Sequence, residues 1–223
     1  MQTCILFLFI RVSMITILKT KTADEFTAIE LDSGETLKIP HGSAGRFRLA
    51  AGEVLNQAAY DQLKAESQRY RCRTSALDYL AVCPRSRAEM ERHLARKGFD
   101  HDLVTEITSG LAEAGYIDDA DYAARYISNR LGKKLVGRNL LTRELQKRGV
   151  HRDVIRQALR ESASLQDTFD EVYEVALKKY ATLRDKKNPL AKLAYFLQGR
   201  GFDGEIITGV IEKIRSGERK EED

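Results

Sequence analysis

Cysteine is scarce in this sequence, with three in 223 residues. Cys4, Cys72 and Cys83 form no CxxC pair, and their odd number leaves one thiol without a partner. A disulfide framework is therefore not expected, and the composition favours a reducing compartment, the cytoplasm. The four histidines lie in unrelated segments without metal-ligand spacing, so we expect neither a zinc site nor another cofactor.

Long apolar runs are missing as well. The apolar segment Cys4–Ile10 is too short to cross a bilayer, no Lys or Arg precedes it, and no small-residue cleavage site follows it. We therefore expect no membrane partner. We also expect translation to start at Met14, which makes residues 1–13 a non-native or disordered extension.

Catalytic signatures are absent too, since the sequence contains no Walker loop and no Rossmann-type glycine pattern. Ser86 has no histidine or lysine partner at motif spacing, whereas Glu89 three residues later makes it a helix-capping residue. The acids Asp118, Asp119 and Asp121 fit the start of a helix better than a metal site. We expect a protein that is not an enzyme.

Charged residues, in contrast, are abundant: they make up 31% of the sequence, with a net charge of +4. Such a mixed surface with a mild basic excess permits an anionic partner without demanding one. Apolar residues make up 43% of the chain, which is enough for a buried core.

A short block of similar sequence occurs three times, at Leu94–Phe99, Leu145–Val150 and Leu197–Phe202, with a period of about fifty residues. In each copy a base precedes a glycine and a hydrophobic residue follows it. Glycine suits the left-handed backbone at the end of a helix, where a Cβ atom is unfavourable. The blocks therefore predict three helix-turn-helix corners in a repeat protein whose neighbouring repeats stack.

We accordingly predict a mainly α fold, in which tandem three-helix repeats form an elongated, curved array with a small N-terminal β-meander. Alternating patterns between residues 15 and 39 predict two or three strands, and helical spacing predicts separate helices over 52–67 and 75–82. The predicted boundaries are the extension over 1–13, a β-rich region over 14–51, a linker helix with the first repeat over 52–115, the second repeat over 116–165, the third repeat over 166–216 and a polar tail over 217–223.

Five motifs carry a family resemblance: Ala76–Leu80, Arg85–Met90, Leu94–Phe99, Gly115–Ala123 and Leu145–Val150. With them, residues 75–214 resemble the RecX family of bacterial recombination regulators. The resemblance implies three tandem three-helix repeats and binding to the RecA recombinase or the RecA–DNA filament. It further implies inhibition of the ATPase, strand-exchange and co-protease activities of RecA, and hence a part in DNA repair, recombination and the SOS response. We expect a monomer.

The strongest charge asymmetry lies between residues 130 and 152, where Glu144 is the single acid. On the helix expected from Arg138, Leu141 and Leu145 face inward, while bases and neutral hydrogen-bonding side chains share another stripe. Such a stripe suits phosphates or acidic side chains, although a solvated helix face is the alternative. The candidate partner-binding residues are Arg130, Lys133, Lys134, Arg138, Arg143, Lys147 and Arg148.

A second candidate patch consists of Arg92, Arg96 and Lys97. Glu89 and Glu91 lie within a turn of this patch, so intrahelical ion pairs are the expected alternative. Two further functions remain open at this point: a helical module that binds DNA directly, and a non-catalytic helical scaffold. A weak contact with DNA is also compatible with binding to RecA.

Overall fold

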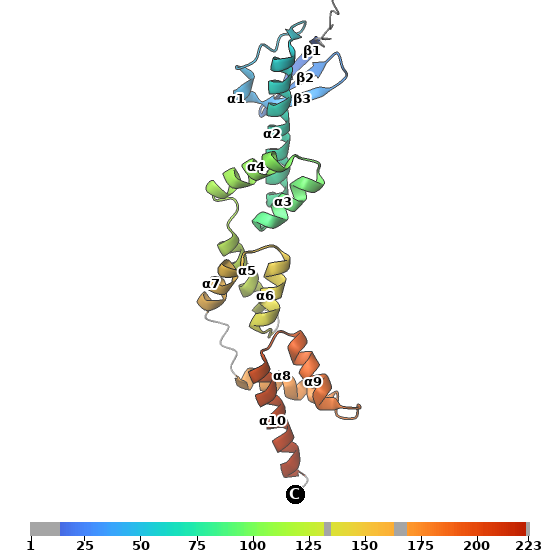
Figure 1. Ribbon diagram of the computed structural model, residues 1–223, viewed down its shortest axis with the longest axis vertical. Coiled ribbons are helices and arrows are strands. Elements are labelled where there is room, and N and C mark those ends of the chain that lie inside the picture. Colours follow the sequence, from blue (N-terminus) through green and yellow to red (C-terminus); the bar gives the residue numbers. More distant parts are fainter. Residues whose placement is uncertain (1–13, 132–134, 163–168, 222–223) are drawn as a thin grey trace, which may run out of the picture. The chain divides into compact units, whose positions relative to one another are not determined.

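The computed structural model describes residues 14–131, 135–162 and 169–221 (Figure 1). The chain divides into two compact units. One contains the residues up to Val82 together with His93–Ser109, and the other contains Cys83–Arg92 together with the residues from Gly110 onward.

The first unit contains an antiparallel sheet with the strand order β3-β2-β1-β4. A turn at Gly34, where φ is +81°, connects the second and third strands, as the sequence predicts. The fourth strand was not predicted, because two residues are too few to show an alternating pattern. The strands are β1 (Ile15–Thr22), β2 (Phe26–Leu31), β3 (Thr36–Pro40) and β4 (Val54–Leu55).

One face of the sheet packs against α2 (Gln57–Val82). The short helix α1 (His41–Ala44) precedes β4 and α2 in the chain. Buried aliphatic side chains from the strands and from α2 form this core: Ile17, Ile29, Leu31, Leu37, Ile39, Leu55 and Leu63. The edge strand β3 is also tied to the helix, because the amide of Lys38 donates a 3.0 Å hydrogen bond to the buried hydroxyl of Ser67.

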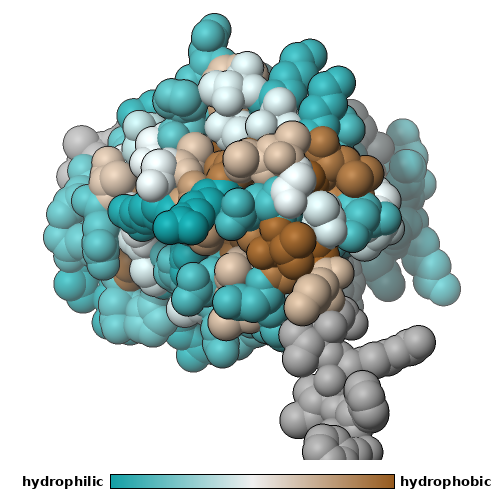
Figure 2. Space-filling view, turned by 90° about the horizontal axis from the view of Figure 1, so that it is seen from above, coloured by the Kyte–Doolittle hydropathy of each residue, from teal (hydrophilic) through white to brown (hydrophobic). Residues whose placement is uncertain are grey.

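Some apolar side chains of the sheet region stay exposed, among them Leu18 and Val54. In the view from above, Figure 2 shows hydrophobic residues (brown) in separate patches among hydrophilic ones (teal). The apolar residues of this region are therefore divided between a buried core and small surface patches.

Helix α2 is continuous over 26 residues, so the prediction of separate helices over 52–67 and 75–82 is wrong. The intervening residues are mostly polar and show little apolar periodicity, yet they contain neither glycine nor proline. Cys72 and Ala76 are fully buried one turn apart, which continues the buried side of the helix. In the same unit, Arg69 on α2 pairs with Glu106 at 2.8 Å, and this contact holds the pKa of Glu106 below its usual value.

The second unit contains two separate helical cores, one formed by α5, α6 and α7 and the other by α8, α9 and α10. The remaining helices of the chain, in order, are α3 (Arg87–Arg96), α4 (His101–Glu113), α5 (Asp119–Leu131), α6 (Arg138–Lys147), α7 (Arg152–Glu161), α8 (Phe169–Ala181), α9 (Pro189–Gly199) and α10 (Gly204–Glu221). A mainly helical fold with tandem three-helix groups and a small N-terminal sheet is thus confirmed. The elongated, curved shape and the domain boundaries remain predictions.

The three predicted corners are present. Gly98, Gly149 and Gly201 have φ angles of +84°, +85° and +86°. In each corner the amide after glycine donates back to the carbonyl of the first leucine of the block, as in Val150 to Leu145 at 3.1 Å. The corners therefore end their helices with the same left-handed geometry.

Candidate functional site

A hydrogen bond to a corner carbonyl occurs twice in the second unit, once from a side chain and once from the backbone. The hydroxyl of Ser86 donates a 2.7 Å hydrogen bond to the carbonyl oxygen of Arg148. Likewise, the amide of Gly137 donates a 2.9 Å hydrogen bond to the carbonyl oxygen of Arg200. Ser86 and Gly137 hold the same position relative to the corner of their own repeat, and each acceptor directly precedes a corner glycine. We call these contacts the first and the second joint.

Close packing at the joints requires glycine. A Cβ atom on Gly149 would lie 2.3 Å from the Cβ atom of Ala88, and a Cβ atom on Gly201 would lie 2.2 Å from the amide nitrogen of Leu140. A Cβ atom on Gly98 would meet nothing within 4 Å among the described residues. Gly149 and Gly201 therefore serve close packing in addition to the backbone geometry of the corner.

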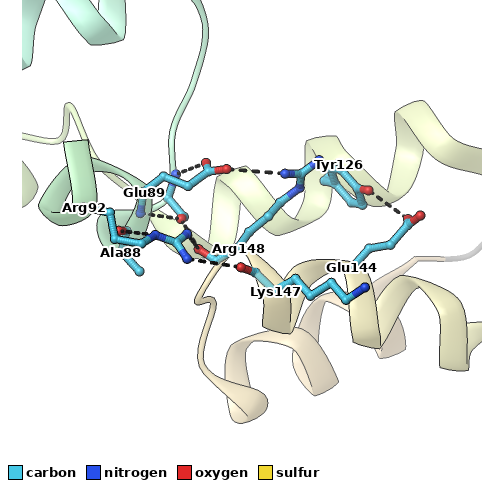
Figure 3. Close-up of polar contacts among 8 residues, drawn as sticks. Ala88, Glu89, Arg92, Tyr126, Glu144, Lys147 and Arg148 are labelled. Carbon is cyan, nitrogen blue, oxygen red and sulfur yellow. Dashed lines mark hydrogen bonds and ion pairs between the residues drawn. The ribbon is translucent and has the colours of Figure 1, made fainter. Parts of the chain in front are cut away.

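The predicted capping box at the start of α3 is present in the first joint (Figure 3). The amide of Ser86 donates to a carboxylate oxygen of Glu89, the amide of Glu89 donates to the Ser86 hydroxyl, and both distances are 3.2 Å. The other carboxylate oxygen of Glu89 pairs with the guanidinium of Arg148 at 3.4 Å. Arg148 is thus held by its backbone and by its side chain.

Two further side chains complete the first joint. The Arg148 guanidinium lies over the ring of Tyr126, 4.8 Å from its centroid. Arg92 donates to the carbonyl oxygens of Ala88, Lys147 and Arg148 (Figure 3). The last two lie at the end of α6, where carbonyls have no partner within the helix, so Arg92 supplies the missing donors. Arg92 and Arg148 are therefore engaged in holding the joint.

Glu144, the single acid of the basic segment, is also engaged internally. It accepts hydrogen bonds from the hydroxyl of Tyr126, at 2.8 Å, and from the guanidinium of Arg130. Burial by itself raises the pKa of Glu144, but the hydrogen bonds from Arg130 and Tyr126 outweigh it and hold the pKa below its usual value. Tyr122 stacks against Tyr126, and burial raises the pKa of Tyr122 to about 12.

Three bases on α6 have a different environment. Arg138, Arg143 and Lys147 are exposed, and their side chains form no hydrogen bond or ion pair with any described residue. Leu141 and Leu145 on the same helix are fully buried, which confirms the predicted orientation of α6. Of the other candidates, Arg130 and Arg148 belong to the internal network just described. Lys133 and Lys134 lie outside the described residues.

The second candidate patch is not held by intrahelical ion pairs with the neighbouring acids, so that expectation is wrong. Glu89 pairs with Arg148 across the joint, and Glu91 pairs with Arg87 at 3.1 Å. Arg96 and Lys97 are exposed and form no ion pair within the described part of the chain. Arg92 prefers backbone carbonyls because the unpaired end of α6 lies within its reach.

A cleft of about 450 Å³ lies beside the second joint and was not predicted from the sequence. Asn139, Thr142 and Arg143 of α6 line one side of it, and Gln198, Phe202 and Ile207 line the other. The sequence feature that could have predicted the cleft is the equivalent position of Gly137 and Ser86 in their repeats. By analogy with Ser86, Gly137 places the start of α6 against the next corner.

Neither a metal site nor a membrane span is found within residues 14–131, 135–162 and 169–221. No group of three or more His, Cys, Asp or Glu side chains in these ranges could hold a metal ion. No helix there is both long enough and apolar enough to cross a bilayer. Asp118 instead accepts hydrogen bonds from the amides of Ala120 and Asp121, as expected of a cap for α5.

Relatives of known sequence cover most of the chain. A regulatory protein RecX from Clostridium perfringens is 27% identical over 172 residues, which are 75% of this chain and 80% of the relative. A regulatory protein RecX from Bacillus subtilis is 28% identical over 198 residues, which are 87% of this chain and 74% of the relative.

Solved structures and family models agree with these relatives. A crystal structure of regulatory protein RecX is similar with a TM-score of 0.70 at 20% identity, covering 89% of this chain and 99% of that one. RecX from Lactobacillus salivarius has a TM-score of 0.57 at 24% identity, covering 66% and 97%. The model of the first RecX three-helix domain matches residues 72–108, and that of the second matches residues 118–159. This chain therefore contains two three-helix domains that match the RecX family and is similar to RecX regulatory proteins over most of its length.

Proposed function

We propose that this protein binds the RecA recombinase or its DNA filament and inhibits the ATPase, strand-exchange and co-protease activities of RecA. Its relatives are named regulatory protein RecX, which supports a regulatory role. The recombinase as target follows from the family resemblance of the motifs, in particular Gly115–Ala123 and the capping box at Ser86.

The observation that carries the proposal is the exposed base stripe of α6, formed by Arg143 and Lys147, together with the exposed Arg138 at the start of the same helix. Arg130 and Arg148 are engaged in internal contacts, whereas these three have no side-chain partner among the described residues. Exposed bases without internal partners are available for charge-assisted hydrogen bonds to an anionic surface. We therefore assign the direct contact with the filament to this stripe, and assign Arg130, Arg148 and Arg92 the role of holding it in position.

Inhibition then follows from occupation of the filament. RecA protomers repeat along the filament, so a protein built from tandem repeats can contact neighbouring protomers at once. Several weak contacts in one chain add avidity without any strong single contact. A protein bound in this way occupies surface that DNA or motion between protomers requires, and ATP turnover stops.

The test is the ATPase activity of RecA on single-stranded DNA, measured with this protein at substoichiometric ratios. Concentration-dependent inhibition is the expected result. Absence of inhibition at every ratio, with protein shown to be folded by circular dichroism, would refute the proposal.

Direct binding to DNA is the second candidate, because the base stripe of α6 suits phosphates as well as carboxylates. This function predicts tight binding to naked DNA and a steep loss of affinity with salt, since each neutralised phosphate releases counterions. Fluorescence anisotropy with a labelled oligonucleotide, from low to physiological salt, separates the two functions. We expect weak binding to naked DNA and stronger binding to the filament.

A further inference from the structure

The cleft beside the second joint combines one charge with neutral hydrogen-bonding groups and an apolar side. Its volume is about 450 Å³. Arg143 is the charged residue among those that line it, and Asn139 and Gln198 supply side-chain amides from opposite sides. Phe202 and Ile207 supply apolar surface. A ligand that fits all of these groups has a negative charge, amide groups and an apolar part.

The two sides of the cleft are held together by backbone contacts. The amide of Asn139 donates to the carbonyl oxygen of Gly201 at 3.1 Å, next to the bond from Gly137 to Arg200. A Cβ atom on Gly137 would lie 2.2 Å from that same Gly201 oxygen. The Arg200 guanidinium also donates to the carbonyl oxygen of Leu135 at 3.1 Å. Because backbone touches backbone here, the cleft is formed before any ligand arrives, which lowers the entropic cost of binding.

A comparison within the chain shows that Arg143 is available. Arg92 and Arg143 hold the same position in their repeats, relative to Gly98 and Gly149. Arg92 donates to the carbonyl oxygens of Lys147 and Arg148 in the first joint. Arg143 makes no such bond within the described residues, and in the second joint the equivalent carbonyl accepts from the amide of Gly137. The first arginine thus binds its own chain, and the second lines an open cleft.

We propose that the cleft between α6 and the corner that joins α9 to α10 binds an extended segment of a partner protein in which an acidic residue stands beside an apolar one, with the carboxylate on Arg143. A guanidinium binds a carboxylate through two parallel hydrogen bonds, which gives both strength and orientation. Side-chain amides donate and accept, so Asn139 and Gln198 can pair with the peptide groups on either side of the acidic residue. Phe202 and Ile207 contact its apolar neighbour.

A nucleic acid fits this cleft less well. A strand of phosphates requires several cations along its path, and Arg143 is the cation among the lining residues. The first turn of α10 also carries acids beside the cleft, since Asp203 caps this helix and Glu205 follows it. A single carboxylate can avoid these acids, whereas a chain of phosphates passes close to them.

This inference rests on the proposed function and names the chemistry of the recombinase segment that is contacted. The test, however, does not require RecA. The full-length protein, labelled with ¹⁵N, is titrated at low salt with a capped Gly-Leu-Glu-Leu-Gly peptide, which carries one carboxylate between apolar neighbours, and amide chemical shifts are followed. We expect shifts concentrated at the side-chain amides of Asn139 and Gln198, and at the Arg143 guanidinium.

Arg143→Ala should raise the peptide Kd by about tenfold or more, because a charged hydrogen-bond partner is lost. The matched control is Arg160→Ala, which removes another exposed arginine of the same unit and should leave Kd unchanged. Shifts outside the cleft, no binding at all, or equal affinity of wild-type and Arg143→Ala protein would overturn the inference. A hexathymidylate that shifts the same cleft resonances at lower concentration would overturn it too, in favour of a nucleic-acid site.

The outcomes for the two proposals are separable. Loss of peptide binding in Arg143→Ala together with no effect of wild-type protein on RecA ATPase would refute the proposed function and retain the acidic-segment site. Inhibition of RecA by the wild-type protein, together with peptide binding that Arg143→Ala does not weaken, would retain the proposed function and refute the site in the cleft.

Discussion

The hydroxyl of Ser86 lies 2.7 Å from the carbonyl oxygen of Arg148, a residue 62 positions later in the chain. The same hydroxyl oxygen accepts a hydrogen bond from the amide of Glu89 in the capping box. Ser86 is fully buried, so neither bond can be replaced by solvent. One side chain therefore both starts α3 and fixes the next corner.

Ser86→Ala should lower the free energy of unfolding by about 1–2 kcal/mol, because a helix cap and a buried hydrogen bond to a carbonyl are lost together. Urea denaturation followed by circular dichroism measures this change. Ser216→Ala is the control. Within the described residues the exposed Ser216 hydroxyl donates to carbonyls of its own helix alone, and a change within about 0.5 kcal/mol is expected. Equal effects of the two substitutions would contradict the role of Ser86 in the joint.

Gly149→Ala and Gly98→Ala form a matched pair, since the two glycines hold the same corner position with nearly the same φ. Both variants lose the left-handed preference of glycine, at a cost of about 1 kcal/mol. Only at Gly149 does the new methyl group also collide with Ala88, which adds about 1–3 kcal/mol. Thermal unfolding of both variants should therefore show the larger loss for Gly149→Ala. Equal losses of stability in the two variants would mean that the close packing of Gly149 on Ala88 does not contribute to the stability of the fold.

The fold could be predicted from the sequence wherever a local rule decides. Gly98, Gly149 and Gly201 were recognisable because a left-handed corner requires glycine after a helix. Helix α2 was divided wrongly because its polar middle hides the apolar period, although no residue there breaks a helix. The short strand β4 was missed because Val54 and Leu55 acquire strand geometry only by pairing with β1.

The site was less predictable because its decisive contacts are far apart in sequence. The basic segment suggested one continuous patch, whereas Arg148 reaches Glu89 and Arg92 reaches the end of α6. Patterns between neighbouring residues do not predict contacts between side chains more than fifty positions apart. The lone acid Glu144 was the available hint, since a single carboxylate among many bases is well placed to pair with one of them.

Substitutions of Arg148 and Arg143 should differ in their effect on stability, because only Arg148 has internal contacts among the described residues. Arg148→Gln removes the ion pair with Glu89 and the contact with the Tyr126 ring, and we expect a loss of about 1–2 kcal/mol in the free energy of unfolding. Arg143→Gln removes no internal contact of the described residues and should change it by less than about 0.5 kcal/mol. Chemical denaturation of both variants gives the answer. A larger loss for Arg143→Gln would contradict the assignment of structural and exposed bases.

Alkaline pH should weaken the fold near Tyr122. The pKa of Tyr122 is raised to about 12 by burial, so the folded state keeps a proton that the unfolded chain releases near pH 10. The stabilisation is therefore complete below pH 10 and is lost as the pH rises through about 12. Unfolding free energies at pH 9 and pH 11 should fall more steeply for the wild-type protein than for Tyr122→Phe. Parallel pH dependences would show that Tyr122 does not retain its proton on folding.

RecA ATPase activity on single-stranded DNA, compared between wild-type protein and the Arg143→Glu/Lys147→Glu variant, tests the central claim most directly. The wild-type protein should inhibit at substoichiometric ratios. The variant, with unchanged unfolding free energy, should require at least about tenfold more protein, because two contacts with the filament become repulsive. Equal inhibition by both proteins, or no inhibition by either, would contradict the account of α6 as the surface that binds RecA.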